Sequence, residues 1–243
     1  IKQKNDGTYM LFGGGQVLPT GAYYNFVIRL NNAGDTIFTK SFGIQMVGSG
    51  RRRDLSGIIT NDNGYLSYGV EGFWIKMDAA GNNLWTYKSN FDAHTDAKSI
   101  DVSVYNEYFA VSANYSSTSP LVIEKLDSNG NFKWDKVFQA NDKVYNCLLK
   151  CTYDGGFVVL GSIINFPSGA TLTPFILKCD SGGNIQYKVL PYDTTGLYGM
   201  SFWTPNDLRI TSDSGFICAF DVPYNIIIKK YNKNGLSSCS NLP

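Results

Sequence analysis

The chain has 243 residues, which is long enough for one large domain with a sizeable core. Apolar residues make up 43% of it and charged residues 17%, a balance that excludes a disordered chain. The 21 basic and 20 acidic residues leave a net charge of +1, so we expect no nucleic-acid partner; no apolar run approaches the roughly 20 residues that insertion into a membrane requires.

In chain order, the sequence divides into five similar units, at 1–43, 44–91, 92–140, 141–191 and 192–243. Near the end of each unit lies a polar turn with a glycine, and these glycines are 47, 49, 53 and 52 residues apart. The turns read Asn31-Asn32-Ala33-Gly34-Asp35, Asp78-Ala79-Ala80-Gly81-Asn82, Asp127-Ser128-Asn129-Gly130-Asn131, Asp180-Ser181-Gly182-Gly183-Asn184 and Asn232-Lys233-Asn234-Gly235-Leu236.

A second polar turn lies upstream in each unit and is degenerate in the third. These turns read Asp6-Gly7-Thr8-Tyr9, Asp62-Asn63-Gly64-Tyr65, Asn106-Glu107-Tyr108, Asp154-Gly155-Gly156-Phe157 and Asp213-Ser214-Gly215-Phe216. Polar clusters between β-branched and aromatic runs predict hairpins, so each unit has four short strands. In the third unit we expect them at 100–104, 108–113, 121–126 and 132–138.

Five copies of a four-stranded antiparallel unit, each of about 49 residues, predict an all-β fold. We expect one domain, a five-bladed β-propeller of four-stranded antiparallel blades. A β-sandwich would not repeat one pair of hairpins five times, and a solenoid of parallel coils would need a shorter period.

The fourth unit shows the repeat most fully, as Asp154-Gly155-Gly156-Phe157, then Ile176-Leu177-Lys178-Cys179-Asp180-Ser181-Gly182-Gly183-Asn184, then Tyr187. This pattern resembles the repeats of secreted bacterial β-propellers, which are often modules of surface or type IX-secreted proteins. The resemblance covers essentially the whole chain. It implies export and a five- to eight-bladed fold, and it implies no particular ligand.

Two further positions recur around each turn glycine. A basic residue stands five positions before the glycine in every unit. Four positions after the glycine stands an aromatic residue in four units and Cys239 in the last. The bases are Arg29, Lys76, Lys125, Lys178 and Lys230, and the aromatics are Phe38, Trp85, Trp134 and Tyr187. Because strand residues alternate between faces, we expect the base opposite the core position to be solvated or snorkelling. The aromatics resemble the tryptophans that staple neighbouring blades.

We expect neither a metal nor a cofactor. The run 127–131 partly imitates a calcium loop but lacks the closing glutamate, so we interpret it as a tight turn. Five repeats are too few for a quinone-dependent propeller dehydrogenase. Neither Cys147 with Cys151 nor Cys218 with Cys239 is close enough to bridge, so we expect mostly free, buried thiols.

Catalysis is the main alternative. The single histidine, His94, leaves no His-rich zinc site and must serve any Ser/His/Asp triad. A glycosidase needs only carboxylates around a central funnel. The candidates, at the starts of the innermost strands, are Asp54, Asp96, Asp142 and Asp207. Acidic residues there also simply solvate loops, so we favour a protein without catalytic residues.

The loops that join the second and third strands, or one unit and the next, gather on one face of a propeller. Here they hold side chains that the repeats do not share. The candidate ligand-binding residues are Tyr23, Tyr24, Arg51, Arg52, Arg53, His94, Tyr198 and Trp203. In a closed five-membered ring the second and fifth units flank the first, so 51–53 and Trp203 approach the loop at 13–24. Flat aromatic faces and forked guanidinium donors suit an acidic glycan or a peptide carboxylate.

We therefore predict a binding or adhesion module of a secreted or cell-surface protein, with a glycan or a surface protein as its partner. We expect a monomeric module within a larger chain. The alternatives are the glycosidase and a purely structural spacer.

Overall fold

The computed structural model describes residues 1–17, 22–43, 56–69, 72–89, 95–114, 121–138, 143–165, 171–191, 204–222 and 225–237. The chain forms two compact units. The first comprises Ile1–His94 together with Asn129–Asn131, and the second comprises Thr95–Ser128 and Phe132–Pro243. No helix in the described ranges is long and apolar enough to cross a bilayer.

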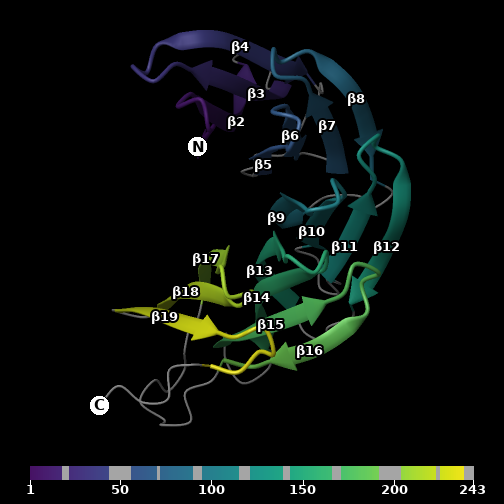
Figure 1. Ribbon diagram of the computed structural model, residues 1–243, viewed down its shortest axis with the longest axis vertical. Helices are drawn as coiled ribbons and strands as arrows, with labels where there is room; N and C mark the ends of the chain where they lie inside the picture. The colour runs from purple at the N-terminus through teal and green to yellow at the C-terminus, as the bar shows by residue number, and fades with distance from the viewer. Residues whose placement is uncertain are drawn as a thin grey trace. The chain divides into compact units, whose positions relative to one another are not determined.

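The first unit holds two antiparallel sheets, each a meander with its strands in chain order (Figure 1). The strands of one sheet are β1 (Lys2–Gln3), β2 (Tyr9–Val17), β3 (Ala22–Leu30) and β4 (Thr36–Gly43). Those of the other are β5 (Ser56–Ile59), β6 (Tyr65–Tyr68), β7 (Phe73–Met77) and β8 (Asn83–Lys88).

The second unit holds three more sheets of the same design. Their strands are β9 (Thr95–Val102), β10 (Tyr108–Asn114), β11 (Leu121–Leu126) and β12 (Phe132–Phe138); β13 (Lys143–Cys151), β14 (Phe157–Asn165), β15 (Thr171–Cys179) and β16 (Ile185–Val189); and β17 (Thr204–Ile210), β18 (Phe216–Val222) and β19 (Asn225–Tyr231). After β19, Ser237 makes a single bridge to Tyr231, and the rest of the expected fourth strand lies outside the described residues. The predicted hairpins of the third unit are confirmed, with β9 starting and ending earlier than expected.

Within each unit, neighbouring sheets pack face to face. We call forward the face that carries Met10 and Val27 in the first sheet, and rear the opposite face. Forward residues of one sheet pack on rear residues of the next, as Val158 and Ile176 do on Phe216 and Cys218. The same relationship joins Met10 and its neighbours to the rear residues of β6 and β7 in the first unit. A stack of twisted sheets with this repeated contact is how a propeller forms its core.

The predicted staples are confirmed at four contacts between successive sheets. Each recurring aromatic ring covers the turn glycine of the next sheet, on the side where a side chain would emerge. A Cβ built on Gly183 would lie 2.8 Å from Trp134 Cη2, and one built on Gly81 would lie 2.9 Å from Phe38 Cε2. Burial raises the pKa of the fourth ring, Tyr187, to about 12.

The prediction that the recurring bases are solvated or snorkelling is wrong for three of the five. Lys76, Lys125 and Lys178 are buried, and for Lys125 and Lys178 the forward face on which they lie is covered by the next sheet of the second unit. Each amine is neutralised by the acidic residue of the upstream turn in its own sheet: Lys76 Nζ lies 2.7 Å from Asp62, Lys125 Nζ 2.7 Å from Glu107, and Lys178 Nζ 3.0 Å from Asp154. Alternation identifies the face on which a strand residue lies, but it does not say whether another sheet covers that face.

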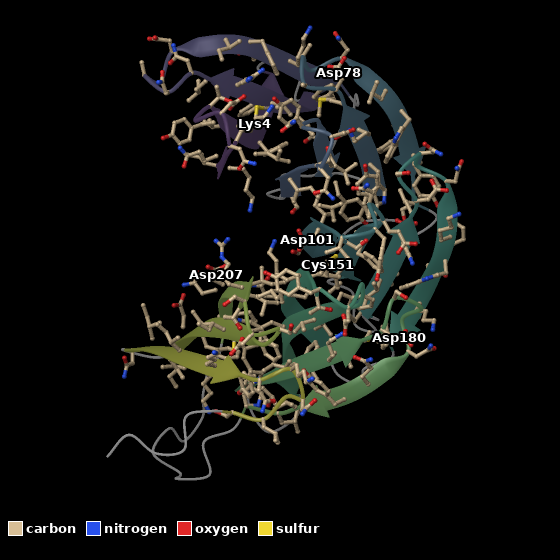
Figure 2. The ribbon with its side chains drawn as sticks, in the orientation of Figure 1. Lys4, Asp78, Asp101, Cys151, Asp180 and Asp207 are labelled. Atoms are coloured by element: carbon tan, nitrogen blue, oxygen red, sulfur yellow. The ribbon has the colours of Figure 1, made fainter. Side chains whose placement is uncertain are left out.

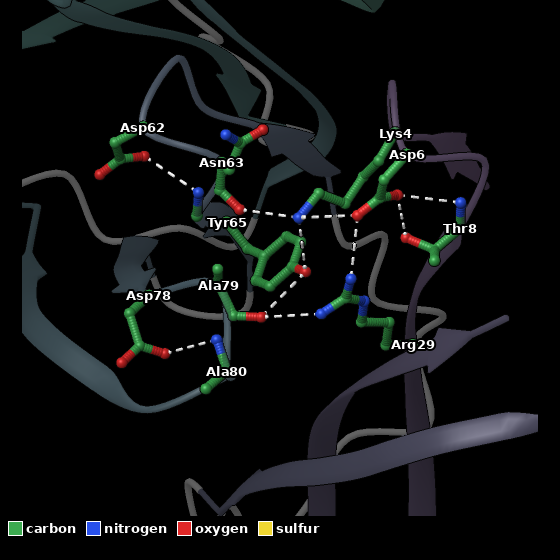
Figure 3. A network of polar contacts seen from close by, with 11 residues as sticks. Lys4, Asp6, Thr8, Arg29, Asp62, Asn63, Tyr65, Asp78, Ala79 and Ala80 are labelled. Atoms are coloured by element: carbon green, nitrogen blue, oxygen red, sulfur yellow. Dashed lines mark hydrogen bonds and ion pairs between the residues drawn. The ribbon is translucent and has the colours of Figure 1, made fainter.

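The first two sheets are also joined by a polar network (Figure 3). Lys4 Nζ donates to the carbonyl of Asn63 at 3.1 Å and to Tyr65 Oη at 3.4 Å. Arg29 donates to Asp6 of its own sheet at 3.0 Å and to the Ala79 carbonyl of the next turn at 3.3 Å. Burial and the Arg29 charge lower the pKa of Lys4. These bonds satisfy main-chain groups at turns, so the network serves packing between the sheets.

Candidate functional site

Most of the residues that the sequence nominates for a site are not described. Tyr23 and Tyr24 lie on β3 and Asp96 lies on β9, but their side chains are outside the described part of the chain. The other nominees outside the described residues are Arg51, Arg52, Arg53, Asp54, His94, Asp142, Tyr198 and Trp203. Their grouping on one face stays a prediction.

Asp207 is the one nominated carboxylate whose side chain is described. It lies on β17, half-exposed, and its Oδ2 accepts a hydrogen bond from Arg209 Nε at 2.9 Å while Oδ1 accepts one from the main-chain nitrogen of Leu208 at 2.9 Å. These contacts satisfy the carboxylate locally. Neither contact involves the second carboxylate that a glycosidase requires, and the side chains of the other candidates, Asp54, Asp96 and Asp142, lie outside the described residues.

The innermost strands of the second unit are bonded through polar side chains. Ser99 Oγ of β9 accepts from the Leu149 nitrogen of β13 at 3.0 Å, and Asp101 Oδ2 accepts from the Cys151 nitrogen at 2.9 Å. Asn146 of β13 in turn donates to the Pro205 carbonyl of β17 at 3.1 Å. Among the described strands, each of these pairs with only one other, so its outer main-chain groups need such partners.

A charged pair adjoins the thiol of Cys151 (Figure 2). Lys150 Nζ lies 3.4 Å from Asp101 Oδ1, and both side chains are mostly covered. Burial first, and the Asp101 charge second, raise the pKa of Cys151 well above its ordinary value, so the thiol stays protonated near neutral pH. Thiolate chemistry needs the opposite shift. The pair is therefore an element of the strand contact and not an activated nucleophile.

The other described cysteines are similar. Cys147, Cys151, Cys179 and Cys218 are all free, as the spacing predicts. Burial raises the pKa of Cys147, Cys179 and Cys218 to about 12. Cys239 lies outside the described residues.

The calcium-like runs form tight turns, as predicted. Asp180 Oδ1 accepts from the Gly182 nitrogen at 2.9 Å and from the Asn184 nitrogen at 2.8 Å, and Gly183 has a φ of 74°. The carboxylate oxygens thus satisfy the bend itself, and these hydrogen bonds lower the pKa of Asp180. Among the described residues, no group of three acidic, histidine or cysteine side chains is arranged to hold a metal ion.

Three exposed apolar side chains gather on the upstream turns of the third and fourth sheets. We call Val104, Tyr105 and Tyr153 the turn cluster; they are 52%, 64% and 56% exposed. Its two turns touch, because a Cβ built on Gly155 would lie 2.4 Å from Tyr105 Cε2. The Asp101–Lys150 pair lies on the strands that enter these same turns.

The turn cluster breaks the repeat. The position of Val104 and Tyr153 holds polar Asn5, Asn61 and Ser212 in the other sheets, and the position of Tyr105 holds an aspartate in all four. Ser103 Oγ replaces that aspartate by accepting from the nitrogens of Tyr105 and Glu107 at 3.2 and 3.1 Å. The side chain at position 105 therefore does not have to accept the hydrogen bonds that the aspartate accepts in the other turns. The degenerate third turn is the feature of the sequence that marks Tyr105 as different.

Comparison with known proteins shows the fold and nothing finer. No family model and no curated protein matches the chain. Several solved structures match the chain. One is a protein of unknown function from Dyadobacter fermentans, which matches at 10% identity and a TM-score of 0.58, with 96% of this chain and 78% of that chain covered. The WD40 domain of Neurospora crassa Pan2 matches at 11% identity and a TM-score of 0.52, with 93% and 64% covered. Chaetomium thermophilum Raptor matches at 7% and 0.55, with 93% of this chain and 24% of Raptor covered.

With its meandering sheets and these neighbours, the chain is an all-β propeller of four-stranded blades.

Proposed function

We propose that this propeller is a non-catalytic binding module that recognises a protein surface through the turn cluster. The observation that carries the proposal is the exposure of Val104, Tyr105 and Tyr153 at positions where the other sheets have polar residues. A side chain that departs from a repeat and is not buried contributes little to the core. Contiguous exposed apolar side chains on a folded domain mark an interaction surface.

The chemistry of the cluster favours a protein ligand. Tyrosine supplies a large, rigid ring and a hydroxyl for a small loss of side-chain entropy, and it is enriched where proteins meet. The aliphatic Val104 adds apolar surface that a sugar ring does not need. A glycan remains the second candidate because two exposed aromatic rings also suit stacking on a sugar.

The proposal also covers where the module acts and the kind of chain that carries it. We place it outside the cell or on its surface, as the resemblance of the repeats implies, and as a monomeric module within a larger chain. The likeness to solved propellers, at 7–11% identity, supports the fold and names no partner for this chain.

Selection against the whole chain tests the proposal. The 243-residue protein is immobilised and panned with a phage-displayed library of peptides and small folded domains. We expect enriched clones whose binding is lost with Tyr105→Ser/Tyr153→Ser. The matched control is Ile226→Ser/Ile228→Ser, which removes two equally exposed apolar side chains from β19 and should leave binding intact.

Other outcomes would replace the proposal. Binding to a glycan array that depends on the two tyrosines would make the ligand a sugar. Release of reducing sugar from a glycan panel would favour the glycosidase. Absence of any enriched clone, or enrichment that ignores the tyrosine substitutions, would remove the turn cluster as the binding surface.

A further inference from the structure

The turn cluster lies where the second unit exposes carboxylates and buries amines. The upstream turns of its three sheets, at 103–107, 152–156 and 211–215, contain one acidic residue each and no basic residue. Each acid pairs with the recurring lysine on the third strand of its own sheet. The side chain of Asp154 is 54% exposed, whereas that of its partner Lys178 is 5% exposed. A ligand that approaches this turn therefore meets the negative charge first.

The Asp154 carboxylate can accept another hydrogen bond. Its Oδ1 accepts from the Thr152 hydroxyl, from the Gly156 nitrogen at 3.0 Å and from Lys178 Nζ at 3.2 Å. Among the described residues, its Oδ2 accepts only from Lys178 Nζ, at 3.0 Å. Each oxygen of an ionised carboxylate has about two acceptor positions. One position on Oδ2 is therefore open to a donor of a ligand.

Two aromatic rings lie beside this carboxylate. Tyr153 directly precedes Asp154 in the chain. Tyr105, from the neighbouring sheet, lies against Gly155, which directly follows Asp154. Both rings are more than half exposed. The faces of aromatic rings attract cations, and a carboxylate at their side adds to that attraction.

We propose that the turn cluster recognises an arginine side chain of its protein ligand, with the guanidinium plane against a tyrosine ring and its edge donating to Asp154 Oδ2. This inference rests on the proposed function and adds the chemistry of the ligand. A guanidinium is planar and weakly hydrated, so it can stack on a ring and donate to a carboxylate at once. The lysine ammonium is a compact, strongly hydrated charge and has no such plane. An acidic segment would place its carboxylates against Glu107 and Asp154.

Peptide selection tests the inference. A phage-displayed library of linear peptides is panned against the whole chain, and the clones whose binding is lost with Tyr105→Ser/Tyr153→Ser are sequenced. We expect arginine to be enriched several-fold over lysine in these clones, relative to the unselected library. The leading peptide is then synthesised with arginine, lysine or citrulline at the enriched position. Citrulline keeps the shape of arginine without its charge, so we expect it to weaken binding by about tenfold or more.

Variants of the protein test the carboxylate. Asp154→Asn should weaken the arginine peptide by about tenfold and leave the citrulline peptide nearly unchanged. Because this change leaves the Lys178 amine without its partner, Asp154→Asn/Lys178→Met repeats the measurement in a protein with no unpaired amine there. The matched control is Asp213→Asn, which removes a half-exposed carboxylate at the same position of the repeat, between two serines instead of beside tyrosines. It should leave the affinity unchanged.

The inference and the proposed function fail in different ways. If no clone depends on the two tyrosines, the turn cluster itself is not the binding surface. If tyrosine-dependent clones show no enrichment of arginine, or if the citrulline peptide binds as tightly as the arginine peptide, the arginine is wrong and the protein-binding surface stands. Equal weakening by Asp154→Asn and Asp213→Asn also overturns the inference, because the general charge of the turns would then explain the effect.

Discussion

Ile176 and Ile228 occupy the same position of successive sheets, two residues before the recurring lysine, yet Ile176 is fully buried and Ile228 is 66% exposed. Ile176 lies on a forward face that β17–β19 cover, and Ile228 lies on the forward face of those last strands. The same position of the repeat is therefore expected to matter for stability in one sheet and to matter little in the other.

The first prediction compares these two residues. Ile176→Ala should lower the free energy of unfolding by about 2–5 kcal/mol, because it leaves a cavity in a packed interface. Ile228→Ala should change it by less than about 1 kcal/mol. Urea unfolding followed by tryptophan fluorescence measures both. Equal losses would contradict the assignment of the forward faces.

The ring-covered glycines give a second matched pair. Gly183 and Gly34 both have positive φ, 74° and 92°, so alanine strains either backbone by about 1 kcal/mol. At Gly183 the new methyl group also meets Trp134. We expect Gly183→Ala to cost roughly 2–4 kcal/mol and Gly34→Ala about 1 kcal/mol in urea unfolding. A larger loss at Gly34 would mean that its turn is already covered.

The buried lysines predict a rescue. Asp154→Asn should destabilise the protein by about 1–2 kcal/mol, a modest figure because the carboxylate is half-exposed while the Lys178 amine is buried. Adding Lys178→Met should restore most of that loss, since a thioether needs no counter-charge. A double mutant less stable than Asp154→Asn alone would show that the lysine contributes through something other than its pair.

Acid should weaken the same pairs. Burial opposes ionisation of Asp62 and Asp154, but hydrogen bonds from Lys76 and Thr60, and from Thr152 and Lys178, outweigh it and lower the pKa of each carboxyl. Because the folded pKa lies below the unfolded value of about 3.9, this stability is complete above about pH 5 and is lost as pH falls through the folded pKa. The urea midpoint should therefore drop between about pH 5 and 2, and less so in Asp62→Asn/Asp154→Asn.

Thiol labelling checks the state of the cysteines. Cys147, Cys179 and Cys218 are buried and have pKa values of about 12, so they should resist iodoacetamide at pH 8 in the folded protein. Unfolding in guanidinium should expose all three to rapid modification. Peptide mass spectrometry after a timed quench identifies each site. Fast labelling of any of them in the native protein would contradict its burial.

Local signals were enough to predict the strands. The turn glycines, the upstream Asp-Gly pairs and the alternation between them are short-range features, and hairpins such as that of β10 and β11 depend on little else. The burial of Lys76 and Lys178 was missed because alternation distinguishes two faces without saying what covers each. That information lies in contacts between sheets some 50 residues apart in sequence.

The candidate site was less accessible to the same reasoning. The residues that the sequence nominates, such as Arg52 and Trp203, are unrepeated residues of long loops and lie outside the described residues. The turn cluster stands instead in short turns that the repeat marks as structural. Tyr105 differs from its counterparts by one substitution, and only the hydrogen bonds of Ser103 explain why the turn tolerates it.

The side-chain bonds along the innermost strands bear on how a partner can bind. Ser99 and Asp101 occupy the main-chain donors of Leu149 and Cys151, the groups that an incoming extended segment would need for its own hydrogen bonds. Strand addition at that edge of β13 is therefore blocked. The same occupation removes a template for edge-to-edge aggregation at that edge of β13.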